Sequence, residues 1–516
     1  MLSALLSPLL GWTLAVTNPA PPPPGRDSAA THATAAEPRL HFRVEPFADA
    51  RDLPNAVAFT VDEHGTVFTA NSLRYGGHGI FDVRRFPALR AQDVTSRSVE
   101  DRRRLMRTWI AEHRFDTPGQ TVTESWLAGF SEQVRRLEDR DGDGRADHVQ
   151  VIADGMNDLV SGAAAGVLAW DGRVYATIIP DLMVMPDTAH ANTDRRVLQS
   201  GFGVHLGQAG HDMHGLTIGL DGRLYWSIAD RGYRFTTREG RTFEGHAGGV
   251  FRCWPDGSEL ERFATGLRNP QELAFTDAGD LFTGDNNADL GDRSRLLYLP
   301  AGSDAGWRFF LQSVRDCGPW TEDHLWEMRG ATRDADPPAW VNTPVAYAGS
   351  CPAGFAAYPG TGLPSREDGT LWLADFVGGV DAFKLEPRGA GFARTDIHEG
   401  FREGWGICDF DFDVAGDAWV LYWGEDWDRN THGRLSRLVP TIAGVDTAAV
   451  REVRTLFANG FGTLADARLV TLLGHADRRV RQRASFELAR RGRVAPLADA
   501  AVRGPSPRAR MHARAW

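Results

Sequence analysis

Residues 210–232 read GHDMHGLTIGLDGRLYWSIADRG, and this stretch contains the pattern that decides the fold. Asp221-Gly222 is a tight-turn pair. After it, Leu224 and Trp226 fall on one side of an extended chain, while the residues between and after them fall on the other. Before the turn, Leu216 to Ile218 form a second apolar run. The stretch therefore predicts a β-hairpin with Gly222 at its turn.

The same turn occurs six times along the chain. Each copy has a turn glycine, one spacer, an apolar residue and an aromatic residue, and the six glycines are Gly65, Gly172, Gly222, Gly279, Gly369 and Gly416. Closely spaced copies lie about 50 residues apart, the length of a four-stranded blade. The pattern predicts a mainly β chain folded as a six-bladed β-propeller. The wide gaps after Gly65 and Gly279 must hold loop or helix insertions.

Residues 39–440 are predicted to form the propeller. We expect residues 43–75 to supply strands of the first blade and the last two blades to close the ring near Leu438. Between Arg84 and Phe130 the sequence becomes charged and helical in character. This segment predicts an insertion over a face or the rim of the propeller, where insertions often shape the mouth of a site.

Two flanking segments differ in composition from the propeller. Residues 1–38 join an uncharged apolar stretch to a Pro- and Ala-rich tether, which indicates a signal-like segment and a periplasmic, secreted or membrane-associated protein. In residues 441–516 apolar positions recur at spacings of three and four, which predicts HEAT-like amphipathic helices packed against the side of the propeller. The pattern breaks off at Trp516, so we expect a truncated repeat with apolar surface left open.

Charge and cysteine content narrow the choice of partners. The net charge of −11 disfavours a nucleic-acid partner, because the phosphate backbone would repel most faces. The sequence contains no Cys-x-x-Cys-His, so the chain itself binds no haem covalently. A Cys317–Cys351 disulfide is compatible with export, although four cysteines allow three pairings.

One acidic loop has the spacing of a calcium site. Asp139, Asp141 and Asp143 alternate with other residues before a glycine, as at the start of a calcium loop. The twelfth position is Gln150 and not a bidentate Glu, so an EF-hand is excluded and Asp147 would supply the last carboxylate. The alternative is a solvated acidic turn.

Polar residues stand before two predicted inner strands. His211 and Asp212 precede one of them, Arg268 and Asn269 precede the next, and Asp230 ends the hairpin of the first. Residues that enter inner strands face the mouth of a propeller channel, so the first four should converge on one cleft. The Asp230 carboxylate should reach an imidazole nitrogen of His211. A neutral imidazole held in one tautomer by a carboxylate is a suitable general base. The alternative is that His211 only caps a strand through backbone hydrogen bonds.

Several phrases of the sequence resemble a known family. Gly210-His211-Asp212-x-His214-Gly215 and Gly266-Leu267-Arg268-Asn269-Pro270-Gln271-Glu272 are similar to motifs of the glucose/sorbosone dehydrogenase-like family, and most closely to the propeller of PVC-type haem-binding membrane-bound dehydrogenases. The resemblance covers residues ~40–440. Residues 472–490 resemble the HEAT repeat that follows in such proteins, usually before a cytochrome c domain.

The resemblance implies an exported oxidoreductase that oxidises a sugar or a sugar-derived alcohol or aldehyde. His211 would be its general base, oriented by Asp230. Its cofactor would be pyrroloquinoline quinone, bound with calcium. The residues implied to contact the cofactor are Arg268, Asn269, Asp212 and His214. A cytochrome c domain or protein would accept the electrons.

The chain departs from that family at three positions. Where the quinone enzymes carry a lysine and two arginines, this chain has Val377, Gly406 and Cys408. Much of the cationic cradle for the carboxylates of the quinone is therefore missing. Two other functions stay open: a non-catalytic propeller and HEAT module that binds glycans or protein partners, and a calcium-dependent lactonase-type hydrolase.

Overall fold

The six turn glycines each lie in the connection between the first and second strands of a blade. All six have a positive φ, between +69° and +87°. Glycine adopts this backbone region without steric cost, which explains the repeated pattern. The computed structural model describes residues 40–514 except 76–78, 189–190, 289, 315–316, 318–340, 403–405, 425–431 and 442–443. The signal-like segment and its tether lie outside the described residues.

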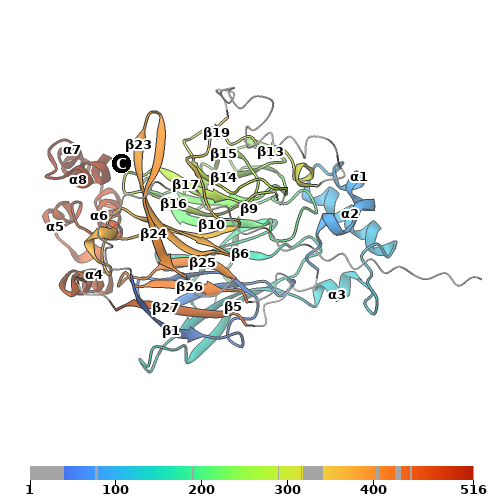
Figure 1. The fold of residues 1–516 in the computed structure, drawn as a ribbon, viewed down its shortest axis with the longest axis horizontal. Coiled ribbons are helices and arrows are strands. Elements are labelled where there is room, and N and C mark those ends of the chain that lie inside the picture. The colour runs from blue at the N-terminus through green and yellow to red at the C-terminus, as the bar shows by residue number, and fades with distance from the viewer. Residues whose placement is uncertain are drawn as a thin grey trace, which may run out of the picture. The chain divides into compact units, whose positions relative to one another are not determined.

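Six antiparallel blades form the propeller, as the sequence predicts (Figure 1). The first blade contains β2 (Ala56–Val61), β3 (Val67–Asn71), β4 (Glu132–Glu138) and β5 (His148–Met156). The second contains β6 (Ala164–Trp170), β7 (Arg173–Ile178), β8 (Asp181–Pro186) and β9 (Arg196–Ser200). The third contains β10 (Met213–Ile218), β11 (Leu224–Ile228), β14 (Gly248–Cys253) and β15 (Glu261–Leu267). The short hairpin of the third blade contains β12 (Tyr233–Thr236) and β13 (Thr242–Gly245).

The remaining blades follow the same plan. The fourth blade contains β16 (Pro270–Phe275), β17 (Leu281–Asp285), β18 (Arg295–Tyr298) and β20 (Ala346–Tyr347). The fifth contains β21 (Pro352–Ala357), β22 (Leu371–Asp375), β23 (Gly379–Arg388) and β24 (Gly391–Phe401). The last contains β25 (Ile407–Phe412), β26 (Ala418–Tyr422), β27 (Arg434–Pro440) and β1 (Phe42–Ala48). A further short strand, β19 (Ser303–Asp304), leaves the fourth blade and pairs in parallel with β15 of the third.

The first strand of the chain closes the ring. β1 pairs with β27, with Val44 opposite Leu438, and completes the last blade. The expectation that residues 43–75 all belong to the first blade is therefore wrong for β1. Each innermost strand contacts the next around the ring, from β2 through β6, β10, β16, β21 and β25 back to β2. Apolar side chains between blades form the core; for example, Trp372 stacks on Phe410 with ring centroids 5.6 Å apart.

The inner strands run in the same direction, which gives the channel two distinct ends. We call the end where they begin the start face and the end where they finish the end face. The insertion between β3 and β4 packs on the start face, where Val83 N donates to Gly207 O at 2.9 Å and Leu206 N to Asp93 Oδ1 at 2.9 Å. Its helical elements are η1 (Val83–Arg85), η2 (Pro87–Leu89), α1 (Arg90–Asp93), α2 (Val99–Ala111) and α3 (Glu124–Ala128). The predicted insertion therefore lies over a face.

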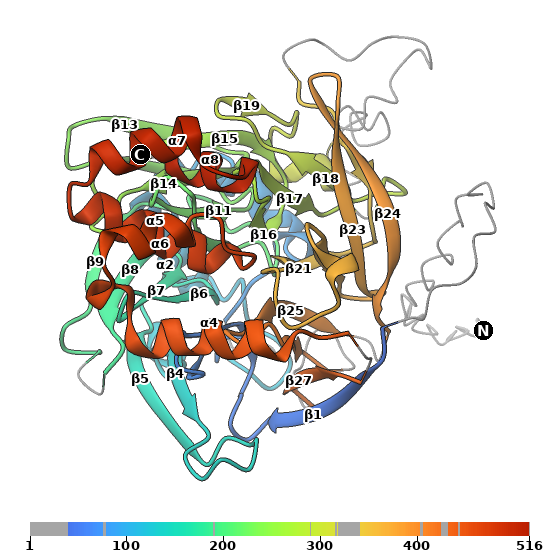
Figure 2. The same cartoon turned by 90° about the vertical axis from the view of Figure 1, so that its left-hand side faces the viewer.

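The C-terminal helices cover the end face and not the side of the propeller, which corrects the expectation (Figure 2). They are α4 (Thr447–Asn459), η8 (Phe461–Thr463), α5 (Asp466–Leu472), α6 (Arg478–Arg490), α7 (Val494–Arg503) and α8 (Pro507–Arg514). α6 touches the ring directly: Arg478 N donates to Pro359 O at 2.8 Å, and Gln482 Nε2 to Gly219 O at 3.0 Å. Val494 and Val502 of α7 are 73% and 74% exposed.

Two other features of the described chain concern membrane spans and disulfides. Among these residues no helix is both long and apolar enough to cross a bilayer. The four cysteines, all within the described ranges, are not disulfide-bonded, so Cys317 and Cys351 do not pair. Two further short helices are η3 (Phe310–Ser313) and η7 (Ser365–Glu367).

Candidate functional site

His211 lies on the start face, two residues before β10 begins. Asp230 follows β11, the strand paired with β10, and Ala229 N donates to Asp212 O at 3.0 Å across the hairpin. This register brings His211 Nδ1 to 2.6 Å from Asp230 Oδ1. The contact that the sequence predicts between these two residues is therefore confirmed.

The hydrogen bonds of Asp230 assign the tautomer of His211. A carboxylate only accepts hydrogen bonds, so His211 Nδ1 carries the proton and Nε2 keeps a free lone pair. The second carboxylate oxygen, Oδ2, accepts from Trp307 Nε1 at 2.8 Å. None of the described residues hydrogen-bonds His211 Nε2.

The surroundings keep His211 neutral. Burial lowers the pKa of His211 most; Asp230 opposes this shift and Arg268 adds to it, and the net result is a pKa below the ordinary value. The side chain of His211 is 5% exposed. At neutral pH the imidazole is therefore available to accept a proton at Nε2.

Arg268 and Asn269 reach the same place from the next blade. Both backbone N–H groups donate to Asp285, at 3.0 Å and 2.8 Å to Oδ1, which fixes the chain just before β16. Arg268 O accepts from Asp230 N at 2.8 Å. The Arg268 guanidinium lies 5.8 Å from the ring centre of Trp307. His211 and Arg268 therefore converge, as the sequence predicts.

Several buried polar atoms of this region lack a protein partner. Arg268 and Asn269 are both 4% exposed, yet Arg268 Nε and Asn269 Oδ1 have no hydrogen-bond partner within the described part of the chain. An unpaired buried polar group costs about 1–3 kcal/mol. A bound molecule with a carbonyl or carboxylate oxygen would satisfy the free N–H of Arg268.

Asp212 and His214 make hydrogen bonds within the propeller, and Asp212 Oδ2 is a further buried atom without a partner among the described residues. Asp212 Oδ1 accepts from Arg231 Nη1 at 2.8 Å and from Ala163 N at 3.2 Å. His214 Nδ1 donates to Ala165 O, and its Nε2 accepts from Asp212 N, both at 3.2 Å. Both ring nitrogens of His214 are thus occupied by backbone groups, and the contact with Ala165 ties the third blade to the second.

The three departures from the resembling family carry no positive charge in the structure. Val377 lies in the turn after β22 and is 36% exposed. Gly406 adopts a φ of +85° before β25, and the Cys408 thiol lies 3.5 Å from Leu421 O. These three positions thus offer no cation for the carboxylates of a cofactor.

Two residues of the site, Trp307 and Gln208, were not predicted from the sequence. Trp307 comes from the loop after β19, and Gln208 precedes His211 by three positions. Gln208 Oε1 accepts from Arg268 Nη2 at 3.0 Å. No spacing or motif marks either residue, because each reaches the site through contacts between distant segments.

The predicted calcium loop is the hairpin between β4 and β5. Ligand oxygens of Asp139, Asp141 and Asp143 lie within 4.8 Å of one another. Asp147 is not part of this group: its oxygens accept the N–H groups of Arg140 and Asp141 at 3.0 and 3.1 Å. Its position corrects the expectation of a fourth carboxylate ligand.

We expect calcium to raise the melting temperature of the wild-type protein. A cation held by three carboxylates stabilises only the folded state, by an amount that grows with its concentration. Differential scanning fluorimetry with calcium and with chelator measures the shift. Asp141→Asn should abolish it, and Asp147→Asn should preserve most of it. Equal melting of the wild type in calcium and in chelator would show that the loop is only a turn.

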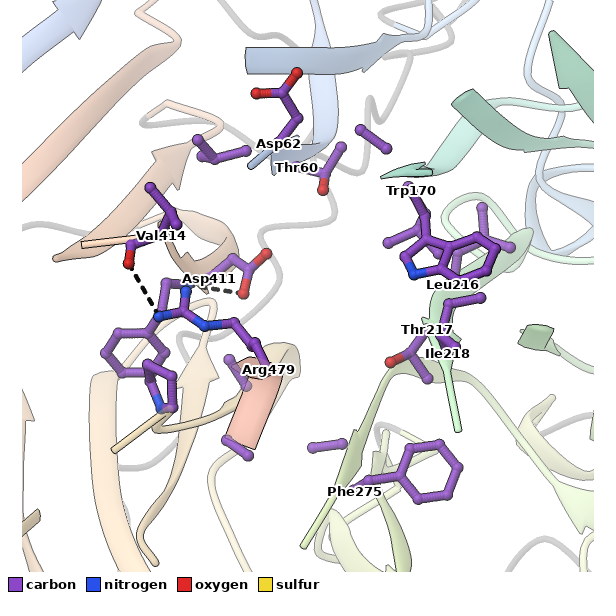
Figure 3. Close-up of a pocket in the computed structure, with 18 of the residues that line it drawn as sticks. Thr60, Asp62, Trp170, Leu216, Thr217, Ile218, Phe275, Asp411, Val414 and Arg479 are labelled. Carbon is purple, nitrogen blue, oxygen red and sulfur yellow. Dashed lines mark hydrogen bonds between the residues drawn. The ribbon is translucent and has the colours of Figure 1, made fainter. Parts of the chain in front are cut away.

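A cavity of about 260 Å³ lies at the other end of the channel. Figure 3 shows side chains from several blades around it, among them Thr60, Leu216 and Phe275. Arg479 of α6, one of the C-terminal helices, also lines the cavity. Arg479 Nη2 donates to Val414 O at 3.2 Å. α6 therefore forms one wall of this cavity and covers the end face of the channel.

Five carboxylates line the cavity: Asp62, Glu63, Glu272, Asp409 and Asp411. Burial raises the pKa of Asp409 to about 7 and that of Asp411 to about 6, and it raises the pKa of Glu272 well above its ordinary value. Within the described ranges, their oxygens do not form a group of three within 4.8 Å, unlike those of the acidic loop.

Comparison with known families and structures finds similar proteins but assigns no activity to this chain. The family model described as "Domain of unknown function (DUF7133)" matches residues 31–403. A search of curated proteins finds no match. A Thermus thermophilus protein described as an oxidoreductase (glucose dehydrogenase) is 15% identical, with a TM-score of 0.46, over 77% of this chain and 100% of its own.

Two further solved structures are similar. The PQQ-bound aldose sugar dehydrogenase of Streptomyces coelicolor is 17% identical, with a TM-score of 0.38, over 61% of this chain and 92% of its own. The holo PQQ domain of pyranose dehydrogenase from Coprinopsis cinerea is 12% identical, with a TM-score of 0.41, over 78% and 98%. With TM-scores below 0.5, the chemistry of this chain rests on its own residues.

Proposed function

The chain belongs to the DUF7133 family, a domain family of unknown function, and from its start-face site we propose that it is an oxidoreductase acting on a sugar or a sugar-derived alcohol or aldehyde. The observation that carries the proposal is the buried His211–Asp230 pair, 2.6 Å apart, with a free ring nitrogen beside Arg268. Oxidation of an alcohol requires a base for the hydroxyl proton.

The protein residues have distinct roles in this proposal. His211 Nε2 takes the hydroxyl proton, and Asp230 holds the ring and stabilises the imidazolium that forms. The Arg268 guanidinium places positive charge next to the reacting oxygen, where negative charge develops. Burial excludes bulk water and strengthens these interactions.

A quinone-type cofactor fits the donors of the site. Arg268 Nε would donate to one of its oxygens, and when bound it would supply the hydride acceptor. The unpaired Asn269 Oδ1 can only accept and would take a hydrogen bond from an N–H or O–H group of a bound molecule. Pyrroloquinoline quinone itself carries three carboxylates, for which Val377, Gly406 and Cys408 offer no cation. We propose that electrons pass on to a cytochrome c domain or protein, and that the chain works after export, in the periplasm or outside the cell.

One observation favours a second candidate function. The missing cations at these three positions are also compatible with a non-catalytic propeller that binds glycans or protein partners. Dye-coupled oxidation separates the two: purified protein incubated with calcium and a quinone should reduce the dye when given aldoses or sugar alcohols. Sugar binding without oxidation under every cofactor condition would favour the binding module.

Replacing Arg268 by alanine should weaken cofactor binding about 10- to 100-fold, because a hydrogen bond from a charged group contributes about 1.5–3 kcal/mol. Calorimetric titration with pyrroloquinoline quinone, and in parallel with an ortho-quinone that lacks carboxylates, measures this. Arg262→Ala, at an exposed position of β15, is the matched control. Equal affinity of both variants for both quinones would remove Arg268 from the cofactor site.

A further inference from the structure

We infer that Trp307 is a positioning residue for the general base: its indole N–H holds Asp230 so that His211 keeps its proton on Nδ1. The inference rests on the function proposed for His211. Trp307 lies 96 positions after His211 in the sequence and belongs to a loop of the fourth blade. It is fully buried, and its Nε1 lies 2.8 Å from Asp230 Oδ2.

The fold carries this tryptophan across a blade boundary. β19 leaves the fourth blade and pairs in parallel with β15 of the third, with Ala305 N donating to Thr265 O at 2.9 Å. Two residues on, Trp307 N donates to Gly266 O at 2.8 Å. The loop is thus fixed to the backbone immediately before Arg268.

Gly266 makes this close approach possible. Its φ is +76°, and a Cβ placed there would lie 2.7 Å from both Ala305 N and Gly306 N. Glycine is required for the backbone conformation and also for the space that the loop occupies. The glycine that opens the Gly266-Leu267-Arg268-Asn269 motif therefore has a structural reason: it admits the loop that carries Trp307.

The indole contacts both halves of the site. An indole N–H can only donate, so it commits Asp230 Oδ2 and leaves Oδ1 for His211. The face of the same ring lies 5.8 Å from the Arg268 guanidinium carbon, within cation–π range. One buried side chain thus orients the carboxylate behind the base and supports the cation beside it.

Trp307→Phe tests the inference, because it removes the indole N–H and keeps an aromatic ring under Arg268. We expect kcat to fall about tenfold or more with KM little changed, since a hydrogen bond to a charged group is lost. The negative charge of Asp230 would then lack the indole donor and be stabilised by His211 alone. This favours the protonated form of His211. The acid limb of the pH–rate profile and the titration of His211, followed by NMR with ¹⁵N-labelled histidine, should both move to higher pH.

Trp419→Phe is the matched control. Trp419 Nε1 donates to Asp413 Oδ2 at 2.9 Å in another buried Trp–Asp pair, far along the ring in the last blade. Both variants should lose similar stability, and only Trp307→Phe should move the titration of His211. Identical His211 titrations and pH profiles in the two variants would overturn the inference.

A second pair of variants covers the case in which Trp307→Phe does not fold. Gly266→Ala should displace the loop and reproduce the effects on His211. Gly302→Ala, at a φ of +83° with open space around it, should not. The NMR titration needs neither cofactor nor substrate. A shifted His211 in a protein that oxidises nothing would refute the proposed function and leave the positioning role standing. An unshifted His211 in an active enzyme would refute the positioning role alone.

Discussion

Replacing His211 by asparagine should lower kcat/KM for dye-coupled sugar oxidation by about 10²–10⁴-fold, the range for loss of a general base. The asparagine amide can still donate to Asp230 from about the position of Nδ1, so the buried carboxylate keeps a partner. The variant lacks Nε2, the nitrogen assigned to proton transfer. Its melting temperature should therefore stay close to that of the wild type.

The pH dependence gives a second readout of the same residue. Burial holds the pKa of His211 below its ordinary value, so the neutral base persists to lower pH. The acid limb of kcat/KM should accordingly fall below about pH 6.5, the value for an unperturbed histidine. In His211→Asn this limb should disappear from the residual activity.

His398→Asn is the control for a general effect of removing a histidine–carboxylate pair. His398 Nε2 lies 2.9 Å from Glu367 Oε2 in the fifth blade, and Glu367 raises the pKa of His398. This variant should retain wild-type activity. If His211→Asn keeps the wild-type rate with the acid limb unchanged, His211 is not the base, and the binding-module function becomes the better explanation.

The propeller could be predicted from the sequence because its decisive signals are local. A hairpin turn that needs a positive φ selects glycine, and the alternating strand after it follows within five residues. Gly222 and the five related glycines therefore mark the first hairpin of every blade. The contact between His211 and Asp230 was also predictable, since both flank a single hairpin whose register follows from its turn.

The features that escaped prediction depend on pairing between distant segments. β1 joins β27 nearly 400 positions away, and the strand itself carries no mark of its partner. Trp307 reaches Asp230 only because β19 crosses to the neighbouring blade. The hydrogen bond from His214 Nδ1 to Ala165 O also depends on how the second and third blades meet. Residue type and spacing contain none of this information.

The helices on the end face depend on one buried carboxylate, and its removal should have the largest effect on stability. Asp477 is the N-cap of α6, where it accepts from Arg479 N at 2.9 Å. Its carboxylate also accepts from Thr361 Oγ1 of the fifth blade and from Arg479 Nη2, both at 2.7 Å. Burial alone would raise the pKa of Asp477, but Arg479 and Thr361 more than offset this, and the pKa is lowered.

Asp477→Ala should lower the free energy of unfolding by about 3 kcal/mol, because it removes a helix cap worth about 1 kcal/mol together with charge-assisted hydrogen bonds worth about 1.5–3 kcal/mol. Since the folded-state pKa of Asp477 is lowered, its contribution is complete at neutral pH and is lost as the pH falls through that pKa. The difference between wild type and variant should therefore shrink in acid. Denaturant titration at neutral and acidic pH measures both effects.

Asp446→Ala separates the docking contact from ordinary helix capping. Asp446 is the N-cap of α4, is exposed, and accepts only from Ala448 N and Ala449 N at 2.9 and 3.1 Å. Its loss should cost about 1 kcal/mol. Limited proteolysis should cut the C-terminal helices faster in Asp477→Ala than in Asp446→Ala, because Asp477, unlike Asp446, bonds to the ring at Thr361 and to Arg479. Equal stability and equal cleavage of the two variants would mean that the end face is closed by the apolar contacts of the helices and not by this carboxylate.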